Sequence, residues 1–537
     1  MQSDDQEDSV SHFALLFLPS AKPTMHLLEL NHDILHDLST FIAPKRDLGH
    51  LISTSRAAYD IFVPALYRDV SVSKEKNAAA LCSTLLSHPE RIDLLRTLKC
   101  VTYDLRFLIT SYPSNLAEVL FRANNLQVLK LTSVELFDEA SSFMPALIQL
   151  KQLRSLSLSE ITPEQCRALL PQLPPGHLRS INLDVREQLP DVLHLLQPLS
   201  ASLEDLTLSF RVYWGRALWC SPLELSSSMH WPRVHTLGLI FVYVDHPDML
   251  SQIFPNARSL DIFGQPCEAR NGRTPQGTVW HNLKSLEINS FSLACQIVDW
   301  QGTGAIDGLF FSEHWLAMNT ADFDESPVSN IHTMLASARP KSFLVQIHRE
   351  LAAPVCSLLQ EFALDLDFLA LSMRSFNAAE VVLDEAKLVD FIPKGLEKLP
   401  IRYFMLNFED FKTEFMALTA LDMPDNRGDN FVIPVLEELV QNCVTTRFPH
   451  ARFVEFLIKV KRYIWEVLRD EQGVVRLRLV PKEKRLRAMG VAYDIQNDLA
   501  IYQVHMQVGT DGFTGRMQRE HLALQKFFAN IRVSGNP

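Results

Sequence analysis

The sequence of 537 residues predicts an α/β fold in which short strands and helices alternate and stack into one long array. A short apolar phrase recurs along the chain at similar intervals, and helix-like segments lie between its copies. A further set of helix-like segments precedes the first copy. Because stacked repeats share one continuous core, the length of the chain does not by itself set the number of domains.

The recurring phrase is an apolar residue, two free positions, an apolar residue, one free position and a third apolar residue. Its centres are between 23 residues (Leu237 to Leu260) and 31 residues (Leu98 to Leu129) apart, and most of the steps fall within the range of about 20–29 that is typical of leucine-rich repeats. The centres of the copies are Leu98, Leu129, Leu156, Ile181, Leu206, Leu237, Leu260, Leu286 and Leu309.

Each copy of the phrase predicts a strand, because its last two apolar residues are two positions apart and point the same way from a strand. The intervening segments predict helices that return the chain, so the strands should be parallel. These helices are expected at 114–125, 163–173, 190–199 and 247–254. The sequence therefore predicts a leucine-rich-repeat solenoid, with parallel strands on the concave face and helices outside.

Beyond residue 311 the phrase weakens, although copies centred on Leu369 and Phe404 still fit it. A further strand is expected near 343–347, and helices are expected at 379–399 and 432–443. We therefore predict regular repeats over 73–311, an irregular continuation over 312–470, and a C-terminal cap and tail over 471–537. The sequence assigns no role to 485–537.

Residues 25–72 precede the repeats and predict three short helices. The first has helical spacing of apolar residues around Leu30 and Ile34, and Asp47 is placed to cap the second. The third, over 57–66, is interrupted by Pro64. Repeat arrays need terminal caps, so these helices could serve only as one. Residues 1–24 predict a disordered arm, and either Met1 or Met25 could be the biological start.

Several stretches of residues 26–72 resemble an F-box, especially that of fungal proteins in which leucine-rich repeats follow the box. The similar stretches are LNHDIL at 30–35, RDLxxL at 46–51, TSR at 54–56 and LYRDV at 66–70. The family usually has proline where this chain has Asn31, and glutamate where it has Asp33. The order of the two parts, box and then repeats, strengthens the resemblance.

The resemblance implies a substrate-recognition subunit of a Skp–cullin–F-box ubiquitin ligase. The box would bind the Skp-type adaptor of a cullin–RING ligase, and the repeats would hold an unknown protein substrate. The adaptor would bind an apolar surface that the isolated chain leaves exposed, at Leu30, Ile34, Leu35, Leu48 and Leu51. The alternative is a leucine-rich-repeat scaffold without a ligase, in which the three helices are only a cap.

The free positions of the phrase should face the concave side, where such solenoids bind their partners. Acidic residues outnumber basic ones at these positions. We therefore predict that the concave face favours a basic segment of a partner. The acidic residues that carry this prediction are Asp184, Asp205, Asp261 and Glu287, against Lys130.

Composition and motifs exclude several other classes. A net charge of −12 argues against general nucleic-acid binding, and no apolar run approaches the roughly 18 residues that span a membrane. The eight scattered cysteines form no CxxC pair, which argues against a zinc site and favours an intracellular protein, cytoplasmic or nuclear. No nucleotide-binding, metalloprotease or hydrolase motif is present, so we expect no enzyme, cofactor or metal.

Overall fold

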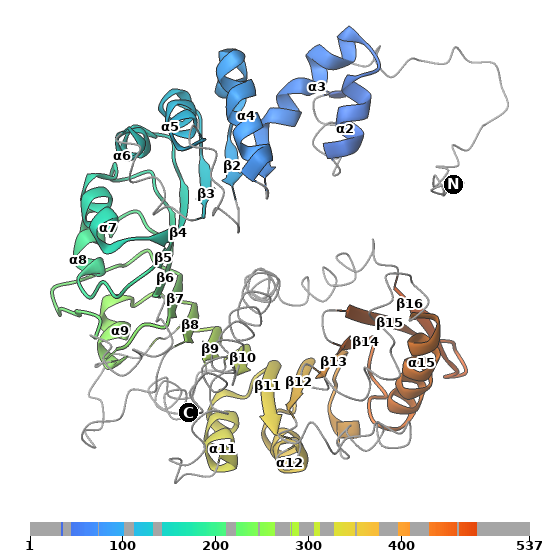
Figure 1. Cartoon of the computed structure of the whole chain (residues 1–537). Coiled ribbons are helices and arrows are strands. Elements are labelled where there is room, and N and C mark those ends of the chain that lie inside the picture. Colours follow the sequence, from blue (N-terminus) through green and yellow to red (C-terminus); the bar gives the residue numbers. More distant parts are fainter. Residues whose placement is uncertain are drawn as a thin grey trace, which may run out of the picture.

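The strands form one open sheet that curves along an arc (Figure 1). The computed structural model describes residues 34–35, 45–72, 75–100, 112–132, 142–210, 222–244, 247–263, 280, 282–288, 306–311, 327–348, 352–374, 396–408, 429–458 and 461–480.

The sheet has sixteen strands in sequence order, from β1 to β16. Strands β1 to β14 are parallel, and β15 and β16 form the C-terminal end of the sheet with antiparallel pairing. The first ten are β1 Asp69–Val72, β2 Thr97–Cys100, β3 Val128–Leu131, β4 Ser155–Ile161, β5 Ser180–Val185, β6 Asp205–Phe210, β7 Thr236–Ile240, β8 Ser259–Phe263, β9 Ser285–Ile288 and β10 Gly308–Phe311. The other six are β11 Ser342–His348, β12 Phe368–Arg374, β13 Tyr403–Phe408, β14 Phe453–Ile458, β15 Lys461–Arg469 and β16 Val475–Leu479.

Helices cover the outer, convex side of the arc, and the strands line its inner side (Figure 1). Two further helices, α2 Lys45–Ile52 and α3 Arg56–Arg68, lie at the N-terminal end of the arc. The outer helices are α4 Glu75–Ser87, α5 Tyr112–Arg122, α6 Phe143–Ile148, α7 Pro163–Leu169, α8 Val192–Leu196, α9 Pro247–Ile253, α11 Pro327–Ala338, α12 Ala352–Phe362 and α15 Asp429–Thr446, with short 3-10 turns η2 Pro89–Leu94, η5 Leu170–Gln172, η6 Gln197–Leu199 and η9 Leu396–Lys398.

The apolar residues of the phrase build one continuous core between the sheet and the outer helices. Leu129, Leu156 and Leu206 at its centres are completely buried, and the same cluster runs from Val70 to Val467. Side chains that cap the first turn help to begin the helices that return the chain. In α7, the side chain of Thr162 accepts a hydrogen bond from the backbone N–H of Gln165, and the side-chain oxygen of Gln165 accepts one from the backbone N–H of Thr162.

A ladder of backbone hydrogen bonds fixes the residue that precedes each strand. The carbonyl of Arg154 accepts hydrogen bonds from the N–H groups of Arg179 (2.7 Å) and Ser180 (3.0 Å) in the next repeat. The carbonyls of Arg96, Glu204 and many equivalent residues repeat this arrangement. Residues at this position are therefore held in line along one edge of the sheet.

The strands predicted at the centres of the phrase, from Leu98 to Leu309, are confirmed as β2 to β10. The expected strands near 343–347, Leu369 and Phe404 are also present, as β11, β12 and β13. The sheet thus continues with the same parallel pairing beyond residue 311. The copies of the phrase beyond residue 311 are nonetheless weaker than those before it.

Two details of the helices differ from the prediction. Helix α3 continues through Pro64 to Arg68, because a single proline does not outweigh the burial of Phe62 and Val63 just before it. Asp47 lies inside α2, whose first residue is Lys45, so it is not the cap. The helix expected at 432–443 lies within α15, and most of the segment 379–399 lies outside the described residues.

Candidate functional site

The inner face of the sheet is the first candidate for binding a partner. Its central line consists of the residue between the last two apolar residues of each phrase, and we call this line the inner row. Hydrogen-bonded register places each member beside the next. The inner row is Lys99, Lys130, Ser157, Asn182, Thr207, Gly238, Asp261, Glu287, Phe310, Leu344, Ala370, Met405 and Glu455.

The first part of the inner row is basic and then neutral. Lys99 and Lys130 lie side by side on β2 and β3, and burial together with the charge of Lys99 lowers the pKa of Lys130. Small polar residues follow up to Thr207. Gly238 comes next, where an added Cβ would approach the Thr207 side chain to 3.0 Å. This stretch is polar without being acidic.

Asp261 and Glu287 form a carboxylate pair in the middle of the inner row. Burial raises the pKa of Asp261 to about 7. Burial and the neighbouring Asp261 charge raise the pKa of Glu287 well above its usual value. Two carboxyls held together in a shielded place resist losing both protons, so the pair carries less than two negative charges at neutral pH.

The four acidic residues of the predicted concave face do not form one continuous row. Asp261 and Glu287 are neighbours, but Asp205 is exposed at the start of β6, beside Ser180 and Thr236. Asp184 lies farther along β5, beside Ser209. The acidic residues are apart because they hold different positions in their phrases, which the register of the strands keeps on separate rows. The raised pKa values further weaken the negative charge of the Asp261–Glu287 pair.

The last part of the inner row is apolar. Phe310, Leu344 and Met405 are buried on the inner face, in a second cluster separate from the main core. The hydroxyl of Tyr403 in this cluster donates a hydrogen bond to the buried carboxylate of Glu455 on β14. The inner cluster is Phe310, Leu344, Ala370, Tyr403, Met405, Phe453, Ile464 and Val480, with Phe368 packed against it.

The N-terminal helices form a third apolar cluster of their own. Leu35, Leu48, Ala58 and Phe62 are all buried at 0–2% exposure, and they do not join the core of the sheet. Ser55 caps α3 by accepting a hydrogen bond from the N–H of Ala58 at 3.1 Å. We call this part, residues 34–35 and 45–68, the helical unit.

The residues predicted to bind an adaptor occupy different places in the helical unit. Ile34 is 50% exposed, whereas Leu35 and Leu48 are buried in the cluster and Leu51 is half-buried against it. Leu35 and Leu48 are therefore part of the interior of the unit, which corrects the expectation of an exposed surface at these positions. Leu30 lies outside the described residues.

Polar contacts join the helical unit to the first repeat. The guanidinium of Arg91, in η2, donates hydrogen bonds to the hydroxyls of Tyr59 (2.7 Å) and Tyr67 (3.0 Å) of α3. It also lies over the ring of Tyr67, 5.1 Å from its centroid. Helix α3 runs directly into β1, so the unit is fixed in orientation relative to the sheet.

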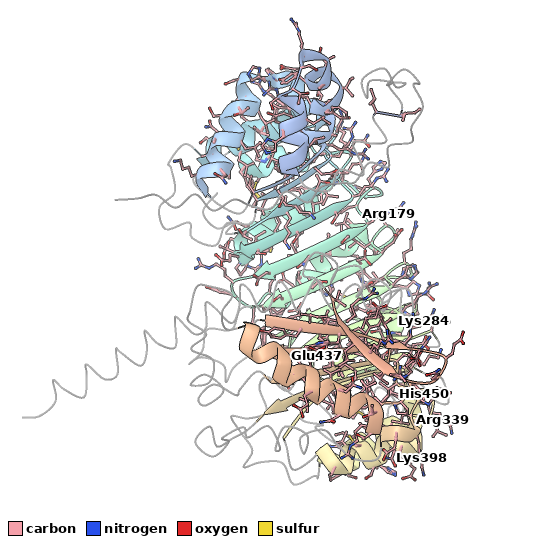
Figure 2. All side chains as sticks on the ribbon, turned by 90° about the vertical axis from the view of Figure 1, so that its right-hand side faces the viewer. Arg179, Lys284, Arg339, Lys398, Glu437 and His450 are labelled. Atoms are coloured by element: carbon pink, nitrogen blue, oxygen red, sulfur yellow. The ribbon has the colours of Figure 1, made fainter. Side chains whose placement is uncertain are left out.

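The edge of the sheet at the start of the strands carries a line of basic residues that the sequence interpretation missed. The position before each strand is Arg or Lys in eight repeats, although the whole chain carries a net charge of −12. The signal was in the phrase itself, in the first free position, as in LRSL at 153–156 and ARSL at 257–260. We call this line the basic rim: Arg96, Arg154, Arg179, Arg258, Lys284, Lys341, Arg402 and Arg452. Figure 2 shows two of them, Arg179 and Lys284, along one edge of the sheet.

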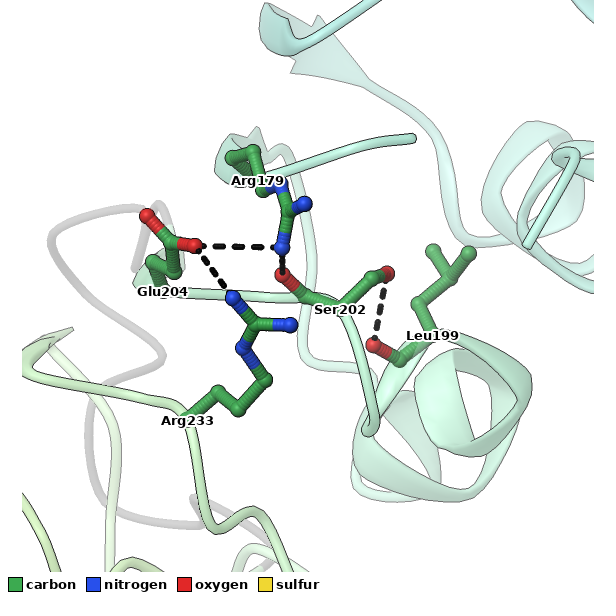
Figure 3. A network of polar contacts seen from close by, with 5 residues as sticks. All are labelled: Arg179, Leu199, Ser202, Glu204 and Arg233. Carbon is green, nitrogen blue, oxygen red and sulfur yellow. Dashed lines mark hydrogen bonds and ion pairs between the residues drawn. The ribbon is translucent and has the colours of Figure 1, made fainter. Parts of the chain in front are cut away.

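Acidic residues neutralise parts of the basic rim. Glu204, at the same position before β6, accepts hydrogen bonds from Arg179 (3.1 Å) and Arg233 (3.0 Å), and Arg179 also donates to the carbonyl of Ser202 (Figure 3). Asp307 pairs with Lys341 at 2.8 Å, and Asp367 pairs with Arg402. Within the described part of the chain, no ion pair involves four exposed members: Arg154, Arg258, Lys284 and Arg452.

The described ranges contain no group of three or more His, Cys, Asp or Glu residues that could hold a metal ion. Burial raises the pKa of the Cys82 and Cys166 thiols to about 12, so neither is a thiolate at neutral pH. No helix in the described ranges is both long enough and apolar enough to cross a membrane.

Comparison with known proteins gives no family assignment. No family model matches the sequence, and no curated protein matches it either. Among solved structures, the chain is similar to a crystal structure of the Rad7 and Elc1 complex from yeast. That similarity has 13% sequence identity and a TM-score of 0.36, and it covers 68% of this chain and 92% of the other. A TM-score at this level does not establish a shared fold.

Proposed function

We propose that the chain is the substrate-recognition subunit of a Skp–cullin–F-box ubiquitin ligase. The helical unit would bind the Skp-type adaptor, and the leucine-rich repeats would hold a target protein. The observation that carries the proposal is the separate apolar cluster of the helical unit. A simple cap would be expected to add its apolar residues to the core that it covers. This unit instead has its own small core, in the part of the sequence that resembles an F-box.

Ile34 is the residue of the helical unit best placed to contact an adaptor. Its side chain is half exposed beside the buried Leu35, so the same turn supplies both a core residue and a surface residue. The buried centre of a protein interface is more apolar than the rest of the surface, so an exposed Ile34 could take part in one. Tyr59, also exposed, lies on the second helix of the same unit.

A second candidate function is a repeat scaffold without a ligase, and the contacts of Arg91 favour it. They hold α3 firmly against the first repeat, as a cap requires. The two functions differ in one measurable respect, because only the first requires an adaptor to bind the helical unit.

Capture of a purified Skp-type adaptor by the full chain tests the proposal. The variant Ile34→Asp should weaken capture at least tenfold, since a charge in an apolar interface is left without a partner. The matched control is Phe121→Asp, which changes an equally exposed residue (52%) on α5 of the repeats, and it should bind like the wild type. Failure of the wild type to capture the adaptor, or equal loss in both variants, would favour the scaffold.

A further inference from the structure

Four exposed members of the basic rim form no ion pair with any described residue, and two of them are neighbours. Arg258 and Lys284 precede adjacent strands, which are roughly 4.8 Å apart in such a sheet. Neighbouring like charges repel each other, and elsewhere on the rim an acidic residue pairs with the cation, as Glu204 does with Arg179, Asp307 with Lys341 and Asp367 with Arg402. Arg258 and Lys284 form no such pair with a described residue, because Asp307, the acidic residue next along the rim from Lys284, pairs with Lys341 on its other side.

The backbone ladder fixes the spacing of these two residues on the sheet. The carbonyl of Arg258 accepts hydrogen bonds from the N–H groups of Lys284 (2.8 Å) and Ser285 (3.0 Å). Both residues are exposed, and Lys284 lies along the edge of the sheet seen in Figure 2. Two positively charged side chains therefore start from adjacent points of one edge, on a chain with an overall excess of acidic residues.

We propose that the basic rim, centred on Arg258 and Lys284, binds an acidic segment of a partner protein. The carboxylates of such a segment would supply the ion-pair partners that Arg258 and Lys284 lack among the described residues. In an extended segment, side chains two positions apart point the same way about 7 Å apart, so two acidic residues can reach the two cations together. Arg154 and Arg452 extend the positive charge toward both ends of the rim.

The pattern of the rim favours a protein segment over a nucleic acid. Glu204, Asp307 and Asp367 interrupt the cations at intervals, and a continuous phosphate backbone would meet each of these negative charges. A peptide can place a neutral or basic residue opposite them. The proposal takes from the proposed function only the role of the repeats in holding a target, so it stands with or without adaptor binding.

Fluorescence anisotropy with a labelled oligoglutamate peptide and the full chain tests the proposal at low ionic strength. The wild type should bind the peptide, and binding should weaken as salt is added. The variant Arg258→Glu with Lys284→Glu should bind at least tenfold more weakly. The neutral pair Arg258→Gln with Lys284→Gln should give an intermediate loss of about threefold. All variants should keep the thermal unfolding midpoint of the wild type.

The matched control is Lys76→Glu with Arg476→Glu, which makes the same charge change at two exposed cations away from the rim, on α4 and β16. It should bind the peptide within twofold of the wild type. Equal loss in the control would overturn the proposal, because net charge alone would explain the binding. So would the absence of wild-type binding, or tighter binding of a single-stranded oligothymidylate of equal charge. Adaptor capture by the rim variants should be unchanged, which separates failure of this proposal from failure of the proposed function.

Discussion

Strands β2 to β7 carry polar or small side chains along the inner row, whereas β10 to β13 carry Phe310, Leu344, Ala370 and Met405 there. The opposite side of both halves is the same, with apolar residues buried against the outer helices. The two halves therefore share one core and differ on the face that points into the arc. In the first half this face is polar, and in the second it is buried.

This difference explains why the phrase fades in the second half of the sequence. A strand with one buried face alternates apolar and polar residues, but a strand buried on both faces reads as an uninterrupted apolar run. The residues GLFF at 308–311 and YFML at 403–406 are such runs. Their strands pair in the same parallel order as those of the first half.

The largest effect should come from truncating either face of β13. Phe404 faces the main core, where its ring stacks on Phe448 with centroids 4.2 Å apart, and Met405 faces the inner cluster. Phe404→Ala should destabilise the fold by about 3–5 kcal/mol and Met405→Ala by about 2–5 kcal/mol, as measured by chemical denaturation. A loss below about 0.5 kcal/mol for Met405→Ala would show that the inner face of the second half is not a core.

A smaller effect should follow from the carboxylate pair at the boundary between the halves. Because burial raises the pKa of Asp261 to about 7, the folded chain binds a proton more tightly than the unfolded chain, whose aspartates titrate near 4. Stability should therefore fall as the pH rises from about 4 to about 7. Asp261→Asn removes the ionisable carboxyl and with it this loss of stability.

We expect Asp261→Asn to be more stable than the wild type at pH 8, by on the order of 2 kcal/mol, and nearly equal to it at pH 4. Thermal unfolding at several pH values measures the difference. Asp205→Asn is the control, because it makes the same substitution at an exposed aspartate of the same sheet. A variant that is less stable than the wild type at pH 8 would mean that the Asp261 carboxylate makes favourable contacts there.

The smallest effect is expected on the polar half of the inner row. Thr207 is half-buried between Asn182 and Gly238, on the face away from the main core. Thr207→Ala should change the free energy of unfolding by no more than about 0.5 kcal/mol, whereas Leu206→Ala one residue away should cost about 2–5 kcal/mol. Equal losses in the two variants would remove the distinction between the faces.

The sequence predicted the parts of the fold that depend on one repeated interaction. Leu98 to Leu309 mark their strands because each fills the same place in the same core. It could not predict the inner face equally well, because register decides which free positions become neighbours. Asp205 holds the second free position of its phrase and Asp261 the third, so the register places them in different rows, and only Asp261 has a carboxylate beside it.

In the helical unit, too, the sequence predicted the apolar residues but not which of them are buried. Helical spacing indicated that Ile34, Leu35 and Leu48 belong to apolar faces, but it did not show which face is inside. Only the packing of α2 against α3 buries Leu35 and Leu48 and leaves Ile34 exposed. The basic rim, in contrast, is visible in the sequence, because Arg or Lys recurs at the first free position of the phrase.

Hydrogen exchange of the full chain, with and without a purified Skp-type adaptor, most directly tests the proposal that the helical unit binds the adaptor and the repeats do not. Bound adaptor should slow the exchange of amides in the helical unit, over 34–35 and 45–68, because an interface excludes water from them. Strands β4 to β9 and the basic rim should exchange at the same rate in both samples. Protection confined to those strands, or no protection anywhere at saturating adaptor, would contradict the account.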